Sequence, residues 1–261
     1  MRFAAGVEYD GTAYHGWQAQ GPGVRTIQSS VEHALSFVAN HPVRVICAGR
    51  TDTAVHARGQ VVHFDTESQR TLRSWVLGAN VNLPVDIALT WVSHVDESFH
   101  ARFSARSRRY RYEILNRWVR PAILHGKVTW HHPPLDEERM RGAAAHLKGK
   151  HDFSTFRALQ CQAKSPVRHV TEISVSRNAD FVSIEVEADG FLHHMVRNIA
   201  GVLMTIGRGE RPPEWIQELL ELRDRTRGGV TAPPDGLYFI RASYDPVFGL
   251  PEPVGSPPVL L

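Results

Sequence analysis

Hydrophobic residues recur along the chain at two spacings, which predict where it forms strands and where it forms helices. Short or alternating apolar runs predict strands at residues 2–9, 43–47, 60–64, 87–92, 107–116, 127–132, 168–177, 181–188 and 237–241. Apolar residues three and four positions apart predict helices at about 26–39, 71–79, 191–207 and 213–222. A further helix opens near residue 135, with acidic residues in its first turn. The mixture indicates an α+β protein.

The order of the predicted elements indicates how the chain is divided. Its first part has the order β-α-β-β-α-β of a ferredoxin-like unit, an architecture also found in RNA-binding (RRM-like) domains. The second part has a similar order without a strong sequence repeat. We therefore expect two ferredoxin-like halves, residues 1–105 and 106–245, whose antiparallel sheets flank a central cleft. Residues 246–261 are expected to form a tail.

Composition narrows the class of protein only modestly. The chain has 261 residues, of which 42% are hydrophobic and 22% charged, as in an ordinary globular protein. Its two cysteines, Cys47 and Cys161, have no paired spacing that would suggest a disulfide framework or a thiolate zinc site. No apolar run approaches the roughly 18 residues of a membrane span, and the first residues lack a signal-peptide pattern. We expect a cytoplasmic protein without a membrane partner.

Positive charge is concentrated in one segment, although the formal net charge is only +3. Seven arginines stand against the single acid Glu113 and are interleaved with aromatic residues: Arg102, Arg106, Arg108, Arg109, Arg111, Arg117 and Arg120. Such a block suits phosphate neutralisation beside base stacking. It is equally typical of a solvated edge strand guarded by charge. Strand alternation separates Tyr110 and Tyr112 on one face from Arg109 and Arg111 on the other.

The histidines raise the question of a metal site. There are fifteen, including the pairs His131-His132 and His193-His194. Adjacent side chains diverge on a strand or a helix, and neither a His-x-x-x-His pattern nor a nearby cysteine completes a ligand set. We expect no metal and no cofactor.

A polar loop between the predicted strands 43–47 and 60–64 is the candidate for chemistry. It carries Arg50 and Asp52, which leave an extended backbone on the same face because they are two residues apart. A nearby guanidinium favours an ionised carboxylate, which can act as a nucleophile. A surface ion pair worth at most about 1 kcal/mol produces the same short pattern and is the commoner case.

The sequence around this loop resembles that of a known family. Arg50-Thr51-Asp52-Thr53-Ala54-Val55-His56-Ala57 is similar to the G-R-T-D-x-G-V-H-A signature of the TruA-like tRNA pseudouridine synthases. Other segments resemble the family's blocks in the same order: Tyr9–Thr12, His15–Gln18, Phe99–Ala105, Arg109–Tyr112, Phe191–Asn198 and Gly236–Tyr238. Ala54 departs from the pattern, because the family usually has glycine there. If that position has a positive φ, alanine strains the loop by about 1 kcal/mol.

The resemblance implies a function for the loop and for two distant residues. It implies a pseudouridine synthase fold that isomerises uridine to pseudouridine at positions 38, 39 and 40 of the tRNA anticodon arm, in a basic cleft. Asp52 would be the nucleophile, Arg50 and Arg197 would hold it ionised, and Tyr110 would stack on the flipped base. A homodimer that grips one tRNA is also implied. Without the resemblance, Arg197 would be an ordinary solvent-facing arginine on its helix.

The sequence also admits two alternatives to an isomerase, each from another class of protein. A non-catalytic RNA-binding protein on the same scaffold would keep the Arg/Tyr surface, but a carboxylate in its groove would repel phosphates. Asp52 therefore discriminates against it. A metal-dependent hydrolase that uses the histidines is a poor third option, which activity in excess chelator would exclude.

Overall fold

The computed structural model describes residues 1–251, which form two compact units. One unit comprises residues 1–108 together with the C-terminal segment from Tyr238, and the other is Arg109–Leu237. The predicted boundary between residues 105 and 106 stays a prediction. Of the predicted tail 246–261, the structure describes a short 3-10 turn, Pro246–Phe248, and residues 252–261 lie outside the described part.

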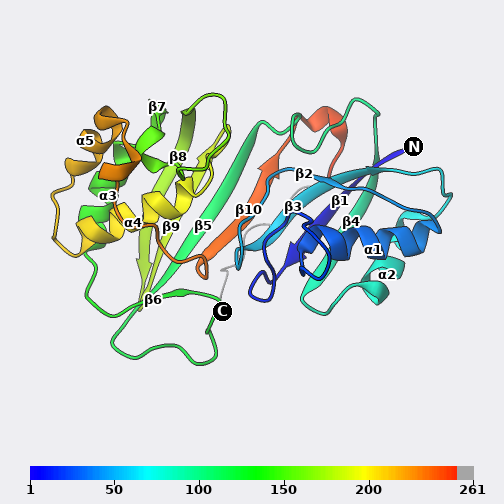
Figure 1. The fold of residues 1–261 in the computed structure, drawn as a ribbon, viewed down its shortest axis with the longest axis horizontal. Helices are drawn as coiled ribbons and strands as arrows, with labels where there is room; N and C mark the ends of the chain where they lie inside the picture. The colour runs from blue at the N-terminus through cyan, green and yellow to red at the C-terminus, as the bar shows by residue number, and fades with distance from the viewer. Residues whose placement is uncertain (252–261) are drawn as a thin grey trace. The chain divides into compact units, whose positions relative to one another are not determined.

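The first unit is a sheet with two helices (Figure 1). Its elements are β1 (Arg2–Tyr9), α1 (Ile27–Ala39), β2 (Ile46–Cys47), β3 (His56–Asp65), α2 (Leu72–Asn82), β4 (Ile87–Val95) and β10 (Leu237–Ser243). The strand order is β4-β1-β3-β10, and β2 also pairs with β3. Strand β1 is antiparallel to both neighbours, whereas β10 joins β3 in parallel. The predicted order β-α-β-β-α-β is confirmed.

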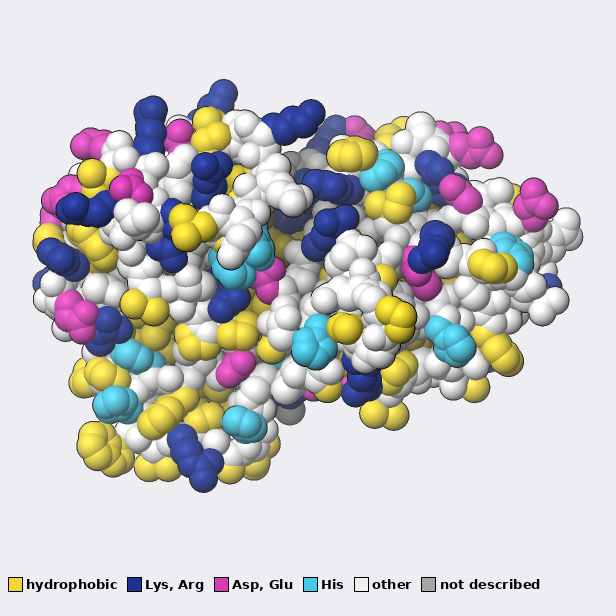
Figure 2. Space-filling view, in the orientation of Figure 1, with side chains coloured by type: hydrophobic (Ala, Val, Ile, Leu, Met, Phe, Trp, Pro, Cys, Tyr) yellow, Lys and Arg dark blue, Asp and Glu magenta, His cyan; other side chains and the backbone are white. Residues whose placement is uncertain are grey.

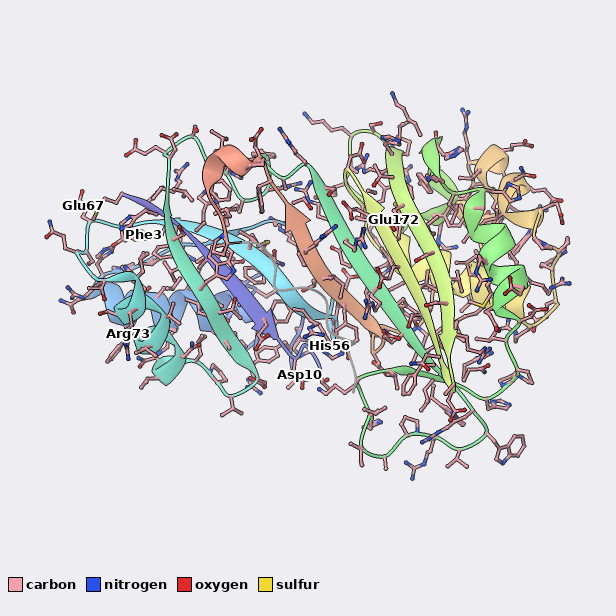
Figure 3. The ribbon with its side chains drawn as sticks, turned by 180° about the vertical axis from the view of Figure 1, so that it is seen from behind. Phe3, Asp10, His56, Glu67, Arg73 and Glu172 are labelled. Carbon is pink, nitrogen blue, oxygen red and sulfur yellow. The ribbon has the colours of Figure 1, made fainter. Side chains whose placement is uncertain are left out.

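Aromatic side chains form the core beneath this sheet. Phe3 and Phe64 stack with ring centroids 5.4 Å apart, and Trp75 of α2 meets Phe64 edge-on at 5.3 Å. All three side chains are buried, and each burial is worth about 1.5–3 kcal/mol. Figure 3 labels Phe3 on its strand. The short apolar run within residues 2–9 therefore reports real burial.

The strand before the polar loop is shorter than predicted. Residues 43–47 were expected to be extended throughout, but only Ile46–Cys47 pairs with β3. Side chains of α1 bind the amides that a ladder would otherwise use. Ser36 Oγ accepts from the Val43 amide at 2.8 Å, and Glu32 Oε1 accepts from the Val45 amide at 3.1 Å. The apolar pattern correctly predicted burial of Val43 and Val45 and wrongly predicted their pairing.

The second unit is also a sheet backed by helices. Its elements are β5 (Ser107–Asn116), β6 (Thr129–His131), α3 (Glu137–Ala145), β7 (Gly149–Asp152), β8 (Val167–Asn178), β9 (Phe181–Ala188), α4 (Met195–Gly207) and α5 (Trp215–Leu222), with 3-10 turns at Ser154–Phe156 and Arg225–Arg227. The strand order is β5-β9-β8-β7, and β6 pairs with β5. Helices α3 and α4 pack together on one face of this sheet (Figure 3). Strand β7 was not predicted.

Helix α4 begins four residues later than its apolar pattern predicted. His194 caps it with φ 61°, in the left-handed region, so residues 191–194 form a turn before Met195. The helix is buried on nearly all sides. Gly201 permits this, because a Cβ there would overlap the Val230 carbonyl oxygen.

The segment between β5 and β6 exposes large apolar side chains. Trp118, Val119 and Ile123 are 81%, 63% and 95% exposed. Figure 2 shows apolar side chains on the surface of this segment, beside basic ones. Contiguous exposed apolar surface of this kind is typical of interaction sites. Among the described residues, no helix has both the length and the apolarity needed to cross a membrane.

Candidate functional site

The four predicted site residues are divided between the two units. Arg50 and Asp52 lie in the first unit, on the loop between β2 and β3. Tyr110 lies on β5 and Arg197 on α4, both in the second unit.

The loop that carries Asp52 presents some side chains to solvent and buries others. Arg50 and Thr53 are exposed, Asp52 is half-buried, and Thr51 and Val55 are buried. The Val55 amide donates to the Asp52 carbonyl at 3.2 Å and closes a tight turn. A carboxylate held on a short turn with its side chain partly open to solvent can act as a nucleophile.

Ala54 adopts the conformation that sequence reasoning raised as a possibility. Its φ is 63°, in the left-handed region that favours glycine. The strain expected from the alanine is therefore present. The Ala54 amide donates to the Tyr14 carbonyl at 3.2 Å, which helps to hold the residue in this conformation.

Neighbouring segments hold this loop on both sides. The Trp17 amide donates to the Thr51 carbonyl at 3.0 Å, and Tyr9 Oη lies 2.8 Å from Thr51 Oγ1. The side chain of Gln60 is fully buried and bonds both the amide and the carbonyl of Gly49, at 3.3 and 2.6 Å. The loop is thus a fixed element, and its rigidity comes from polar groups buried beside it.

His56 ties the end of the loop to the turn after β1. Its Nδ1 accepts from the Gly11 amide at 3.1 Å and lies 3.2 Å from Asp10 Oδ1. Figure 3 labels both His56 and Asp10. The imidazole is buried and stacks on Tyr238 of β10, with ring centroids 4.6 Å apart. Gly11 has to be glycine here, because a Cβ would overlap the Val55 carbonyl.

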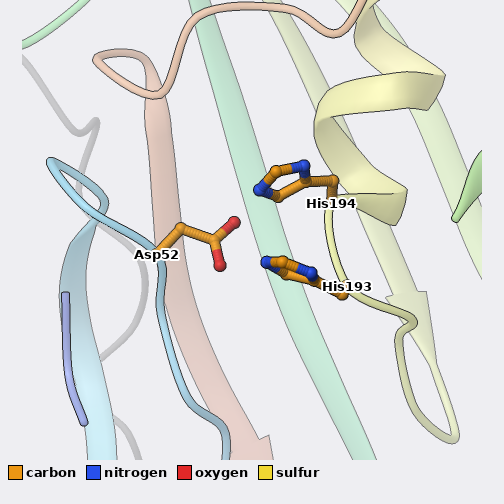
Figure 4. A group of neighbouring side chains, drawn as sticks. All are labelled: Asp52, His193 and His194. Carbon is orange, nitrogen blue, oxygen red and sulfur yellow. The ribbon is translucent and has the colours of Figure 1, made fainter. Parts of the chain in front are cut away.

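The adjacent histidines His193 and His194 do not diverge as predicted. Their ring centroids are only 4.0 Å apart. The left-handed φ of His194 places the pair in a turn, where the alternation of a strand or helix does not apply. Figure 4 shows both imidazoles ahead of α4, together with the Asp52 side chain on its own loop. The expected absence of a metal stays a prediction.

Arg197 is anchored through one nitrogen of its guanidinium. Nε donates to the Ala232 carbonyl at 2.8 Å, and the Ala232 amide donates back to the Arg197 carbonyl at 3.1 Å. The first bond restrains the guanidinium, and the second joins the backbones of the two residues. Arg197 also differs from an ordinary solvent-facing arginine, because the side chain is only half-exposed.

Tyr110 is a buried ring on β5. It is 8% exposed and meets Phe191 edge-on, with centroids 4.9 Å apart. Tyr112, on the same face as predicted, is fully buried and bonds Thr129 Oγ1 at 2.6 Å. Buried neighbours therefore set the orientation of the Tyr110 ring.

Two arginines of the dense block, Arg109 and Arg111, are neutralised inside the second unit. Arg109 forms ion pairs with Glu172 of β8 and with Glu185 and Glu187 of β9. Arg111 Nε donates to Glu185 Oε1 at 2.7 Å. The glutamates of the neighbouring strands face these two arginines, which favours a structural role for them over the suggested contacts with phosphates. Their opposite alternation to Tyr110 is confirmed.

Sequence reasoning missed the residues that hold the Asp52 loop. Tyr9, Thr51 and Gln60 read as strand or loop positions, and their partners are far away in the chain. One signal was available for Gln60, a polar residue next to the apolar run Val61–Phe64. Its complete burial requires bonded partners.

Comparison with known proteins places the chain in a family. The family model described as tRNA pseudouridine synthase matches residues 5–104 and 143–245. The chain is 58% identical to tRNA pseudouridine synthase A of Pseudomonas aeruginosa over 96% of its length and 88% of the relative's. It is 57% identical to that of Nitrosococcus oceani over 97% of both chains, and 59% identical to that of Methylococcus capsulatus over 96% and 92%.

A solved Cbf5-Nop10-Gar1 complex resembles 77% of this chain and 45% of its own, with 12% identity and a TM-score of 0.32, too weak a likeness to support an argument. The family model and the high identity over nearly the whole chain are decisive. The chain belongs to the tRNA pseudouridine synthase family.

Proposed function

We propose that this protein isomerises uridine to pseudouridine in tRNA, with Asp52 as the nucleophile. The observation that carries the proposal is the fixed turn around Asp52, which presents one half-buried carboxylate in a family whose relatives are named tRNA pseudouridine synthase A. The reaction gains and loses no atoms overall. One carboxylate can therefore supply the covalent step.

The proposed steps break one bond and form another. Asp52 attacks either ribose C1′ or uracil C6, and the bond between N1 and C1′ breaks. The uracil turns, C5 bonds to C1′, and the bond between Asp52 and the substrate breaks, which regenerates the carboxylate. The C5 proton leaves, and N1 is protonated. Because the target base starts within a stem or at its junction with the loop, it must first be flipped out, at a cost of a few kcal/mol.

The other predicted residues have distinct roles in this scheme. Arg50 and Arg197 pair with the Asp52 carboxylate, and Arg50 can occupy the space that the flipped base leaves. Tyr110 stacks on the flipped base and moves the C5 proton. The anchoring of Arg197 by Ala232 and of Tyr110 by Phe191 supports these roles, because both side chains are held in one orientation.

The same proposal includes the architecture, the compartment, the target positions in tRNA and the oligomeric state. The two units are ferredoxin-like halves around a basic cleft, which the strand order β4-β1-β3 of the first supports. The enzyme acts in the cytoplasm, where tRNA is processed, on positions 38, 39 and 40 of the anticodon arm. It works as a homodimer, and the exposed apolar segment around Ile123 supports a partner surface.

The competing function is RNA binding without catalysis on the same scaffold. It does not account for Asp52, because a carboxylate among phosphate contacts weakens RNA binding. Nor does it account for the polar groups buried around Thr51 and Gly49, whose effect is to fix the loop.

The test is to incubate the full chain with an unmodified tRNA transcript and to map pseudouridine. Asp52→Asn is expected to abolish isomerisation and to bind tRNA equally well or better, because the amide keeps the shape and removes one repulsion from the phosphates. Turnover by Asp52→Asn near that of the unsubstituted protein would refute the assignment of Asp52. Pseudouridine found outside positions 38–40 would refute the assigned target alone.

A further inference from the structure

Tyr9 ends β1 at the point where the chain reaches the loop of Asp52. Its side chain is 5% exposed, and its hydroxyl shares a hydrogen bond of 2.8 Å with the hydroxyl of Thr51. Thr51 is itself buried and precedes Asp52 in the chain. The phenol is therefore one residue away from the proposed nucleophile and has no direct access to substrate through its buried ring.

The backbone of Thr51 is held at the same time as its side chain. Its carbonyl accepts from the Trp17 amide at 3.0 Å, while its hydroxyl meets Tyr9. Gly16 allows the close approach, since a Cβ on it would lie 2.7 Å from the Thr51 oxygen. Two separate bonds thus determine where the peptide between Thr51 and Asp52 lies.

Because both hydroxyls are buried, loss of the hydrogen bond between them is costly. An unpartnered buried hydroxyl costs about 1–3 kcal/mol, so the loss of either partner favours a shift of the loop that rehydrates the other. Burial also raises the pKa of Tyr9, which keeps the phenol protonated and able to donate. The cheapest response to loss of the Tyr9 hydroxyl is a displacement of Thr51, and Asp52 moves with it.

We infer that Tyr9 is a positioning residue for the reaction: through Thr51, its hydroxyl sets the place of the Asp52 carboxylate. The inference rests on the proposed function, in which Asp52 reacts. Misplacement of a reacting group by about 1 Å can cost about a hundredfold in rate. Tyr9 is expected to affect the chemical step and to leave the grip on tRNA unchanged.

The experiment compares variants of the full chain under single-turnover conditions with an unmodified tRNA transcript. Tyr9→Phe is expected to slow pseudouridine formation by roughly tenfold to a hundredfold and to change tRNA affinity by less than about twofold. Thr51→Val removes the other hydroxyl at nearly constant shape and is expected to do the same, whereas Thr51→Ser restores most of the rate. The double variant Tyr9→Phe/Thr51→Val is expected to be no slower than Tyr9→Phe alone, because Tyr9→Phe already removes the interaction that Thr51→Val removes.

Hydrogen exchange provides a second measure that does not depend on activity. The amides of residues 48–56 are expected to exchange faster in Tyr9→Phe. Tyr244→Phe is the control, because it removes another phenol of the first unit, one that donates to the Ala101 carbonyl at 2.7 Å. It is expected to leave both the rate and the exchange of residues 48–56 unchanged.

Each outcome decides one of the two claims. Normal rate and exchange in Tyr9→Phe would overturn the positioning role, as would an equal loss of rate in Tyr244→Phe. Turnover by Asp52→Asn would instead overturn the proposed function, and loop exchange in Tyr9→Phe would still decide whether the phenol holds the loop. Failure of Thr51→Ser to recover would also contradict the hydroxyl pair.

Discussion

The Asp52 loop and strand β5 both carry charged residues that suggested a function. In the structure, the surroundings of these charged residues differ. In the loop, buried neutral groups hold the backbone, and Arg50 is exposed while Asp52 is half-buried. In β5, the arginines themselves are held, because Arg109 and Arg111 face glutamates of β8 and β9. Charge in a sequence becomes available to a substrate only where the neighbouring strands do not neutralise it.

The largest effect that separates the two regions is expected at Tyr110, on the face of β5 opposite the neutralised arginines. Tyr110→Phe keeps the stacking ring, so tRNA affinity is expected to survive, while loss of the hydroxyl lowers turnover by about a hundredfold or more. The variant should form an adduct with Asp52 without releasing pseudouridine. Single-turnover kinetics with adduct trapping measures this, beside Tyr110→Ala, which should lose binding as well. Normal turnover by the phenylalanine variant would reduce Tyr110 to a stacking surface.

The arginines proposed to serve Asp52 are expected to give the next largest effect. Arg50→Ala and Arg197→Ala should each lower turnover by roughly tenfold to a hundredfold and lower tRNA affinity far less, because they act on one carboxylate and one base. The salt dependence of tRNA binding is the second measurement, and its slope should change by less than about one unit. If the affinity for tRNA fell as much as the rate, Arg50 and Arg197 could not be distinguished from surface arginines, and their assignment to the site would be wrong.

Arg109→Ala tests the other half of the comparison. Removal of its guanidinium takes away the ion-pair partner of Glu172 and Glu187, while Glu185 keeps Arg111, so the free energy of unfolding is expected to fall by about 2 kcal/mol. The salt slope of tRNA binding should stay the same.

Arg117→Ala is the control from the same arginine block, measured by urea unfolding beside Arg109→Ala. Its ion pair with Asp180 is exposed and 4.0 Å long, so it should cost less than about 1 kcal/mol. A flattened salt slope in Arg109→Ala would show that Arg109 serves phosphates after all.

A pH effect is expected from a histidine buried in the same sheet as the Asp52 loop. Burial, aided by His100, lowers the pKa of His63 to about 4, and its Nδ1 accepts from the Ala101 amide at 3.1 Å. The unfolded chain binds this proton near pH 6.5, so the stabilisation is present above that pH and is lost as pH falls toward 4.

Urea midpoints at pH 7.5 and pH 5 measure this loss. His63→Gln should show a smaller drop between the two, because glutamine can accept the same bond without titrating. An unchanged drop in His63→Gln would assign the pH dependence to other groups.

The smallest effect concerns the strain in the loop itself. Ala54→Gly is expected to raise the free energy of unfolding by up to about 1 kcal/mol, because φ 63° favours glycine by more than glycine loses in chain entropy. Ala145→Gly at the end of α3 is the control and should lower it by less than about 1 kcal/mol. Thermal unfolding of both variants measures the difference, and a loss of stability in Ala54→Gly would mean that contacts of the methyl group outweigh the strain.

Local periodicity predicted most of the helices and strands but few of the contacts between them. Residues 2–9 and 181–188 form strands with the predicted bounds. The apolar run of the first is buried on both faces, and the alternation of the second reports one buried face. The pattern could not reveal that Glu32 and Ser36 would take the amides of residues 43–45, or that Glu185 would face Arg111. These outcomes depend on which strands and helices become neighbours. The proximity of His193 and His194 required a left-handed φ that no apolar pattern encodes.

The candidate site shows the same division. The position of Asp52 on a loop between strands followed from the sequence, and the positive φ at Ala54 was raised by it. The contacts of Tyr9 with Thr51 and of Gln60 with Gly49 join residues far apart in the chain, so local patterns carry no trace of them. The roles of Arg50, Arg197 and Tyr110 stay predictions.

The parallel pairing of β10 with β3 affects how the protein can be made. Tyr238 and Phe239 lie beside His56 and Ala57, directly after the Asp52 loop. During synthesis, residues 1–108 emerge from the ribosome long before β10, because the whole of Arg109–Leu237 emerges in between. Closing so long a connection is slow and entropically costly. The sheet that bears Asp52 is therefore completed late in synthesis. Until β10 has been made, the edge of β3 next to the reactive loop has not yet paired with it.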